Sequence, residues 1–293
     1  MKDAARLLAY FALTLLLGAI LAPLLFWGGQ ALASHRILPF LAAFDFESFF
    51  HRALMVAGIL LIWPFLRSLQ VRRLSDLGLA PDQRWLSHLL GGLLFAAIPL
   101  LCCGAALVVF HIYSLRVTFS ARAVATILGA STVVPIIEEL LFRGLILGIL
   151  LRSGRKYLAM FVTSAFFSVL HFLKAPEHTS TVVTWMSGFN SIAHSFAQFS
   201  DPMLVAAAFT TLFLLGWILA DTRLRTEALW LPIGLHAGWI FGNGLFNRLA
   251  RRQVLALPWI GKNLLVGLVP LGVCGITWLL IVLWLNMRKN RRI

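Results

Sequence analysis

Charged side chains are scarce in this sequence. They make up 12% of its 293 residues, against 60% for hydrophobic residues, and the mean hydropathy is +0.89. A soluble domain of this length carries about twice that share of charge, so the composition excludes one. We predict an all-α polytopic membrane protein with about eight transmembrane helices around an intramembrane cavity.

Acidic residues are scarcer than basic residues. Eleven Asp and Glu stand against 25 Lys and Arg, which gives a net charge of +14. Most of the basic residues lie in short connections beside apolar runs, where positive-inside sorting and anionic headgroups favour them. The excess charge is therefore explained by the lipid bilayer as partner, and we expect no nucleic acid partner.

Cysteine is also rare. Cys102, Cys103 and Cys274 lie within apolar runs without metal-ligand spacing, which argues against a disulfide framework and a cysteine metal centre. A cleavable signal is missing too, because the apolar stretch after Lys2 and Arg6 has no small-residue cleavage site. We predict that this stretch is an anchor helix.

Eight apolar runs are long enough to cross a bilayer, at about 20 residues a span. They cover residues 7–27, 49–66, 89–113, 123–151, 157–173, 203–220, 229–249 and 264–286. Gly28 and Gly29 are expected to end the first, and a charged turn at 221–227 to follow the sixth. Residues 72–88 are predicted to lie on the headgroups and 174–202 to form an amphipathic cover. We expect residues 1–293 to form a single membrane domain.

An even number of spans places both termini on the same side of the membrane. Lys and Arg are more numerous in the connections of that side, although Arg248, Arg251, Arg252 and Lys262 lie on the other. The positive-inside rule then predicts a multi-pass protein of the cell (inner) membrane with cytoplasmic termini.

Three ionisable side chains interrupt the fourth run: Glu138, Glu139 and Arg143. Such groups are costly at membrane depth unless they are paired or wetted, which indicates a function. On a helix, Glu139 and Arg143 are four residues apart and face the same way, so they are expected to pair. Glu138 then lies about 100° round the axis, where it can face a cavity. A purely structural ion pair is the alternative.

Two histidines in other runs are predicted to lie at a similar depth. From the same side of the membrane, Glu139 is about 18 Å deep, His171 about 21 Å and His236 about 10 Å, at 1.5 Å per residue. Helix ends are uncertain by several residues, so these depths are compatible with one site. Two histidines beside two carboxylates favour a shared site over packed, satisfied residues.

Several intramembrane chemistries lack their motifs. The sequence contains no H-E-x-x-H, no G-x-S-G and no pair of aspartates within spans. The remaining chemistry is a buried Glu that takes a proton from water while a His steadies the attacked oxygen. Alternatively, a Zn²⁺ ion is held by Glu138, His171 and His236. Arg143 argues mildly against that cofactor, because it would place a cation beside a dication.

Three segments in order resemble the motifs of one known family. They are E-E-L-L-F-R-G at 138–144, F-x-x-x-H at 167–171 and L-H-A-G-W at 235–239. The chain resembles the CPBP family of CAAX-processing and bacteriocin-processing intramembrane proteases, also called abortive-infection proteins, over about residues 121–247. The resemblance implies an eight-helix membrane endopeptidase with its site in a cavity inside the bilayer.

The resemblance also implies roles for the motif residues. Glu138 is carried over as the base that activates water, supported by the pair Glu139 and Arg143, with His171 and His236 as site histidines. We further expect Phe142 and Phe167 to line the substrate-binding part of the site. The family is often labelled metal-dependent, and a glutamate-activated water without metal is the competing view.

One position departs from the family pattern. The third motif of the family is H-x-x-x-N, and the residue four after His236 is Ile240. Asn243 lies at nearly the same helical angle, about 4.5 Å farther along the axis. Its glycine neighbours could let the helix unwind and bring the amide back. Either Asn243 holds the developing oxyanion, or the enzyme is weakened.

The predicted function is hydrolysis of a peptide bond within the membrane. The expected substrate is a membrane-associated peptide or protein, with a lipid-modified tail or a leader. A catalytically weakened relative that acts as a membrane adaptor or regulator is the alternative that Ile240 favours. A proton-coupled carrier, with Glu138, Glu139 and His171 as relay, is the third, although no broken-helix pair or inverted repeat supports it.

Overall fold

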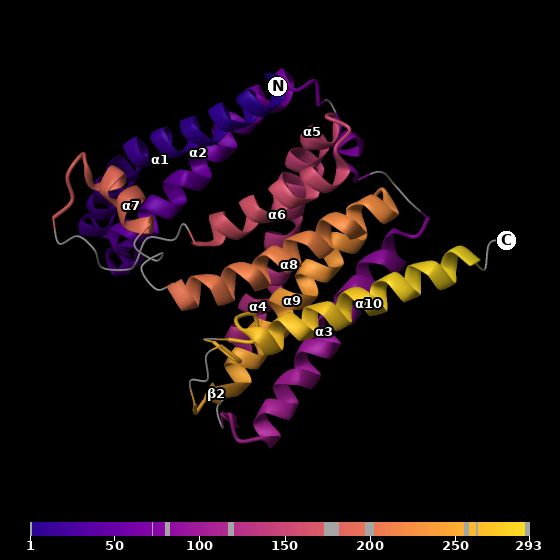
Figure 1. Cartoon of the computed structure of the whole chain (residues 1–293). Helices are drawn as coiled ribbons and strands as arrows, with labels where there is room; N and C mark the ends of the chain where they lie inside the picture. The colour runs from indigo at the N-terminus through magenta and orange to yellow at the C-terminus, as the bar shows by residue number, and fades with distance from the viewer. Residues whose placement is uncertain are drawn as a thin grey trace. The chain divides into compact units, whose positions relative to one another are not determined.

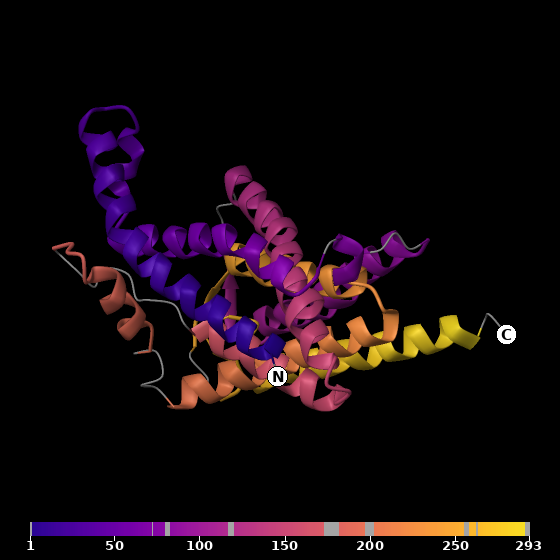
Figure 2. The same ribbon diagram turned by 90° about the horizontal axis from the view of Figure 1, so that it is seen from above.

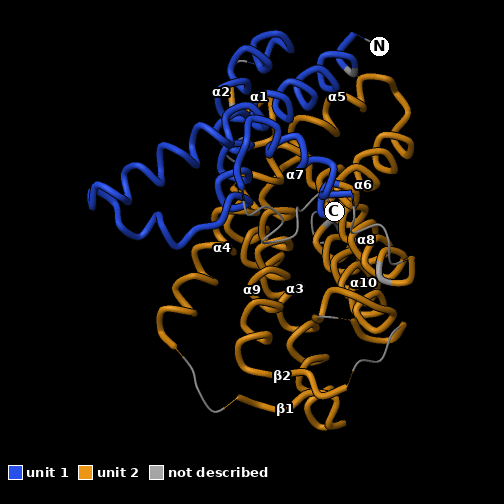
Figure 3. The backbone as a smooth tube through the Cα atoms, turned by 90° about the vertical axis from the view of Figure 1, so that its left-hand side faces the viewer, with its two compact units in different colours: residues 1–72, 170–201 blue, residues 73–169, 202–293 orange. Residues whose placement is uncertain are grey.

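The computed structural model describes residues 2–71, 73–79, 83–116, 120–172, 182–196, 202–254, 258–261 and 263–290. These residues are predominantly helical (Figure 1). By their internal contacts they divide into two compact units, coloured separately in Figure 3. Unit 1 comprises residues 1–72 and 170–201, and unit 2 comprises residues 73–169 and 202–293.

Unit 1 is built on an antiparallel helical hairpin. Helix α1 (Lys2–Ser34) and helix α2 (Phe46–Ser68) run side by side and are joined through a 3₁₀ turn, η1 (Pro39–Ala43) (Figure 1). The Asp45 side chain accepts a hydrogen bond from the Ser48 N–H, 3.0 Å away, and so caps α2. A short helix, α7 (Ser187–Ser195), packs on both, because its small serines and Gly188 allow close approach to α1.

Unit 2 contains the remaining elements. Its helices and turns are η2 (Leu74–Leu77), α3 (Trp85–Val109), α4 (Ala121–Glu139), η3 (Leu140–Ile146), α5 (Leu147–Leu151), most of α6 (Lys156–Phe172), α8 (Pro202–Thr226), α9 (Trp230–Leu249) and α10 (Leu268–Asn290). Helix α3 packs most extensively on α9, and α10 lies along α8 (Figure 2). A core of buried Leu, Ile and aromatic side chains, centred on Trp239 and Phe246, joins α3, α8, α9 and α10.

Five described helices are long and apolar enough to cross a membrane: those at Ala5–Ser34, Phe46–Ser68, Trp85–Val109, Val205–Thr226 and Leu268–Arg288. The shorter Lys156–His171 is apolar as well. An all-α polytopic membrane fold is thereby supported, and the count of eight stays a prediction. Two predicted helix ends are wrong. Helix α1 continues through Gly28 and Gly29, and α8 continues to Thr226 through the charged residues expected to form a turn.

Two short strands were not expected from the sequence. Strand β1 (Tyr113–Leu115) pairs antiparallel with β2 (Ala250–Arg252), with Ser114 opposite Arg251. The strands follow α3 and α9, so the ladder closes the end of unit 2 where both of these helices terminate (Figure 3).

The two segments predicted to lie on the membrane surface are described in part. Within 72–88 the structure forms η2 and the first turn of α3. Within 174–202 it forms α7, whose flanking Trp185 and Met186 are exposed. The other calls made on residues 173–181 and 197–201 lie outside the described residues.

Candidate active site

The first motif lies where the fourth helix changes its hydrogen-bonding pattern. Helix α4 ends at Glu139, and the next seven residues, Leu140–Ile146, form a π-helix before α5 resumes regular α-helix. A π-helical turn is rare and often marks a functional site, because it is stable only where the surroundings hold it. Glu138 and Glu139 therefore stand at the junction of two helical geometries.

Glu139 and Arg143 form the predicted ion pair. Arg143 Nη1 donates to Glu139 Oε1 at 2.9 Å, and both side chains are fully buried. Arg143 Nη2 donates to the carbonyl oxygen of Gly216 in α8 at 3.1 Å. The guanidinium is thus held from two helices, which one charged partner alone would not do.

Gly216 allows this second bond because it lacks a side chain. A Cβ at Gly216 would lie 3.1 Å from the Cβ of Ser164 in α6, and 3.0 Å from its Cα. Helices α6 and α8 can therefore approach closely, which places the Gly216 carbonyl beside Arg143. Sequence reasoning missed this acceptor, because a backbone carbonyl leaves no signal in residue type.

The orientation of His236 follows from a glycine face on α9. Gly234, Gly238 and Gly242 recur every fourth residue and pack on the backbone of α3, where a Cβ on Gly238 would lie 2.8 Å from the Cβ of Ala96. His236 lies about 160° round the helix axis from Gly234 and Gly238 and about 120° from Gly242, on the face turned away from α3. It therefore points toward α4, which also packs on α9. The G-x-x-x-G-x-x-x-G repeat was the sequence signal that could have predicted this orientation.

His236 connects the two carboxylates. Its Nδ1 lies 2.8 Å from Glu139 Oε1, and its Nε2 lies 3.7 Å from Glu138 Oε2. A carboxylate accepts hydrogen bonds, so we assign the Nδ1–H tautomer, in which Nε2 faces Glu138. Glu138 keeps 26% of its side chain exposed, whereas Glu139 is fully buried. The adjacent glutamates thus differ as predicted: one is buried in the ion pair, and the other is accessible.

The aromatic residues of the first two motifs enclose the guanidinium. Phe167 lies under Arg143, with 4.5 Å from Cζ to the ring centroid, and packs edge-on against Phe142 and His236. Phe142 and Phe167 are 4% and 2% exposed. Their contacts stabilise the cation, and their expected role in binding substrate stays a prediction.

A loop ties the motif helix to the start of α9. A Cβ on Gly144 would lie 2.9 Å from the carbonyl oxygen of Leu77 in η2, so only glycine fits this contact without a shift. The next residue, Gly78, accepts a hydrogen bond from the Leu229 N–H at 3.0 Å. The last residue of the first motif therefore helps to set the distance between Glu139 and His236.

His171 lies in a different compact unit from the other predicted catalytic residues. It lies in the last turn of α6 and is exposed. It belongs to unit 1, whereas Glu138, Glu139 and His236 belong to unit 2. Its convergence with the carboxylates therefore stays a prediction.

Asn243 lies in an unbroken helix. Helix α9 is regular from Trp230 to Leu249 and does not unwind at Gly242–Gly244, where the glycine at 242 packs against α3. Within the described residues, Asn243 Oδ1 is buried and accepts no hydrogen bond. Ile240 occupies the position one turn after His236, as the sequence requires. A site role for Asn243 stays a prediction.

The described side chains of unit 2 supply few donors for a metal ion. No group of three or more His, Cys, Asp or Glu in the described part of the chain is placed to hold one. Glu138 and His236 supply two donors, whereas Glu139 already accepts from Arg143 and His236 through one oxygen. We therefore derive no step through a metal.

The comparisons with known proteins agree with the motifs. The model of the family described as type II CAAX prenyl endopeptidase Rce1-like matches residues 119–242. No curated protein and no solved structure matches the chain. The matched range contains both glutamates, Arg143, His171 and His236, and it ends just before Asn243. The predicted family resemblance is thereby confirmed.

Proposed function

We propose, from the match of residues 119–242 to the Rce1-like family of CAAX endopeptidases, that this chain is an intramembrane peptidase whose water is activated by Glu138. The family is a protease family, which supports peptide hydrolysis in general. The role of Glu138 as the base rests on one observation, the series of contacts Arg143–Glu139–His236–Glu138. In this series a buried ion pair orients a histidine toward a partly exposed carboxylate.

The chemical step uses one water and one proton. The proposed water lies against the exposed part of the Glu138 side chain, because Glu138 Oε2 is itself buried, 3.7 Å from His236 Nε2. Glu138 accepts a proton from this water as its oxygen bonds to the carbonyl carbon of the substrate. The carbon–nitrogen bond then breaks, and the proton on Glu138 passes to the departing amine. No net proton is gained or lost by the protein.

Glu139 and Arg143 act through His236. Glu139 holds the Nδ1 proton, so the imidazole cannot rotate or change tautomer without losing a buried hydrogen bond. Arg143 fixes the Glu139 carboxylate through the hydrogen bond from Nη1, and the Gly216 carbonyl fixes Arg143 in turn. We therefore assign Glu139 and Arg143 as positioning residues, in the manner of the carboxylate that orients a catalytic histidine in hydrolases.

Two further groups complete the proposal. The negative charge on the carbonyl oxygen needs a donor, and His171 and Asn243 are the candidates that the sequence offers. The substrate we propose is a membrane-associated or lipid-modified tail or leader peptide, because both carboxylates end one helix, α4, whose other residues are uncharged apart from Arg122. The bilayer is the second partner, and the protein is proposed to be a multi-pass protein of the inner cell membrane with cytoplasmic termini.

The test is cleavage in proteoliposomes. A prenylated peptide ending in C-a-a-X and its unprenylated counterpart are incubated with the reconstituted chain, and products are identified by mass spectrometry. We expect cleavage of the prenylated peptide, and a loss of about 10²–10⁴-fold in Glu138→Gln, since removal of a general base costs this much. His171→Ala is expected to lose activity as severely.

Glu227→Gln is the matched control, because it removes an exposed carboxylate of unit 2 that lies outside the motifs. It should cleave as the wild type does. If Glu138→Gln retains more than a tenth of wild-type turnover while folded and inserted, the assigned base is wrong. If wild type cleaves neither peptide nor any leader peptide tested, the adaptor alternative gains support.

A further inference from the structure

The end of unit 2 that carries the β-ladder is basic and has no acidic counterpart. Four exposed arginines lie there, called the basic rim below: Arg116 after β1, Arg122 in the first turn of α4, Arg248 at the end of α9 and Arg251 in β2. The sequence has no Asp or Glu between residues 83 and 137, nor after Glu227. The rim therefore cannot be neutralised by its own segments.

The β-ladder places two arginines of the basic rim on its exposed face. Tyr113 and Ala250 belong to one face of the ladder and are buried in the core of unit 2. Ser114 and Arg251, which pair directly, belong to the other face and are exposed. Arg116 continues the same alternation, because its N–H donates to the Leu249 carbonyl oxygen at 2.8 Å. Backbone bonds thus place Arg116 and Arg251 on the outer face.

Arg252 differs from its neighbour in this respect. Its Nη1 donates to the Gly261 carbonyl oxygen at 3.0 Å, so this arginine supports the loop before α10. Arg122 lies in an unfavourable electrostatic position, because a cation in the first turn of a helix faces the positive end of the helix dipole. The helix dipole therefore favours an anion beside Arg122.

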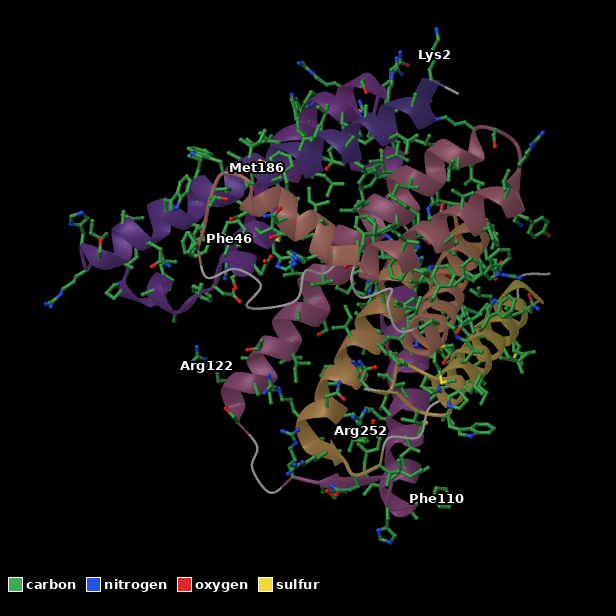
Figure 4. All side chains as sticks on the ribbon, turned by 60° about the vertical axis from the view of Figure 1, so that its left-hand side comes forward. Lys2, Phe46, Phe110, Arg122, Met186 and Arg252 are labelled. Carbon is green, nitrogen blue, oxygen red and sulfur yellow. The ribbon has the colours of Figure 1, made fainter. Side chains whose placement is uncertain are left out.

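We infer the depth of the basic rim from the length of α9. Helix α9 has 20 residues, which span about 30 Å, the thickness of the hydrocarbon core. Arg248 lies about 18 Å along this helix from His236. Large apolar side chains are exposed at the same end, including Phe110 at 72%, Leu115 at 68% and Trp259 at 60%. Figure 4 shows Phe110, Arg122 and Arg252 toward this end of unit 2.

We propose that the basic rim binds the headgroups of anionic phospholipids in the adjoining leaflet, with Arg116 and Arg251 as the principal phosphate contacts. Arginine is suited to this because its planar fork donates two hydrogen bonds to one phosphate. The exposed aromatic and aliphatic side chains lie among the acyl chains below the headgroups. The proposal concerns lipid binding alone and does not depend on peptidase activity.

The experiment uses photoactivatable phosphatidylglycerol or phosphatidylcholine as probes in nanodiscs of phosphatidylcholine. The cross-linked peptides are mapped and quantified over residues 109–116 and 248–254. We expect phosphatidylglycerol to label these residues more than phosphatidylcholine, by about fivefold for each contributing arginine. The double variant Arg116→Gln/Arg251→Gln should bring the two labels to the same level, and Arg116→Lys/Arg251→Lys should retain most of the preference.

Arg155→Gln is the control, because this exposed arginine lies between α5 and α6, away from the ladder. It should leave the labelling of the two segments unchanged. Equal labelling of the wild type by both probes, or a preference that survives the double Gln variant, overturns the proposal. Loss of the preference on addition of millimolar inorganic phosphate also overturns it, since the rim would then be a site for free phosphate. Circular dichroism of both double variants verifies that the helices remain folded.

Discussion

Replacement of Arg143 by leucine is the sharpest test of the buried network. Arg143→Leu leaves the Glu139 carboxylate fully buried, with His236 as its remaining neighbour at 2.8 Å. Removal of one partner of a buried pair costs about 3–5 kcal/mol, because the other charge stays uncompensated. The substitution also removes the bond to Gly216 and the ring contact with Phe167. This loss is a large part of the about 5–15 kcal/mol that stabilises a folded protein.

The assay is thermal unfolding in detergent micelles, followed by tryptophan fluorescence. At about 2–4 °C for each kcal/mol in a chain of this size, Arg143→Leu should lower Tm by about 6–20 °C. The double variant Glu139→Leu/Arg143→Leu also removes the buried Glu139 carboxylate, so it should be more stable than the single variant. Both should be inactive, because the double variant loses the Glu139 bond that orients His236 and the single variant loses the Arg143 bond that holds Glu139 in place.

Arg225→Leu provides the comparison. Arg225 pairs with Asp221 at the same four-residue spacing, with 2.7 Å from Nε to Oδ2, but 39% of its side chain is exposed. Its loss should cost less than the loss of Arg143, because Arg225 is partly solvated and Asp221, although only 9% exposed, keeps a hydrogen bond from Trp278 Nε1 at 2.9 Å. If Arg143→Leu is no less stable than Arg225→Leu, or if the double variant is the least stable of all, the Glu139–Arg143 pair does not hold the site in the way argued above.

Two further predictions concern the reacting groups. Purified wild type should contain much less than one equivalent of zinc, and a chelator should leave cleavage unchanged; stoichiometric zinc that is lost in His236→Ala would reverse this conclusion. At the position one turn after His236, Ile240→Asn should raise turnover measurably, since one oxyanion donor is worth about 10²–10³ in rate. If Asn243 already serves as donor, Ile240→Asn should change little and Asn243→Ala should be severe; turnover unaffected by both would show that neither position contacts the oxyanion.

Much of the chemistry of this protein follows from its sequence alone. Low charge and long apolar runs require membrane helices, because an unpaired backbone cannot cross the hydrocarbon core. The four-residue spacing of Glu139 and Arg143 fixes their pairing, because it lies within one helical turn. The order of the three motifs also indicates the family, because a motif is defined by residue identity and spacing and can be recognised without knowing how the helices pack.

The tertiary structure decided how these residues meet. His236 is 97 residues from Glu139, and its contact with Glu139 depends on the rotation of α9 about its own axis. That rotation is set by the glycine face against α3, and the Gly216 carbonyl becomes available only because α6 and α8 approach closely. Local periodicity carries no information about either contact. The continuation of α1 through Gly28 and Gly29 has the same cause, since packing on α2 outweighs the weak helix propensity of glycine.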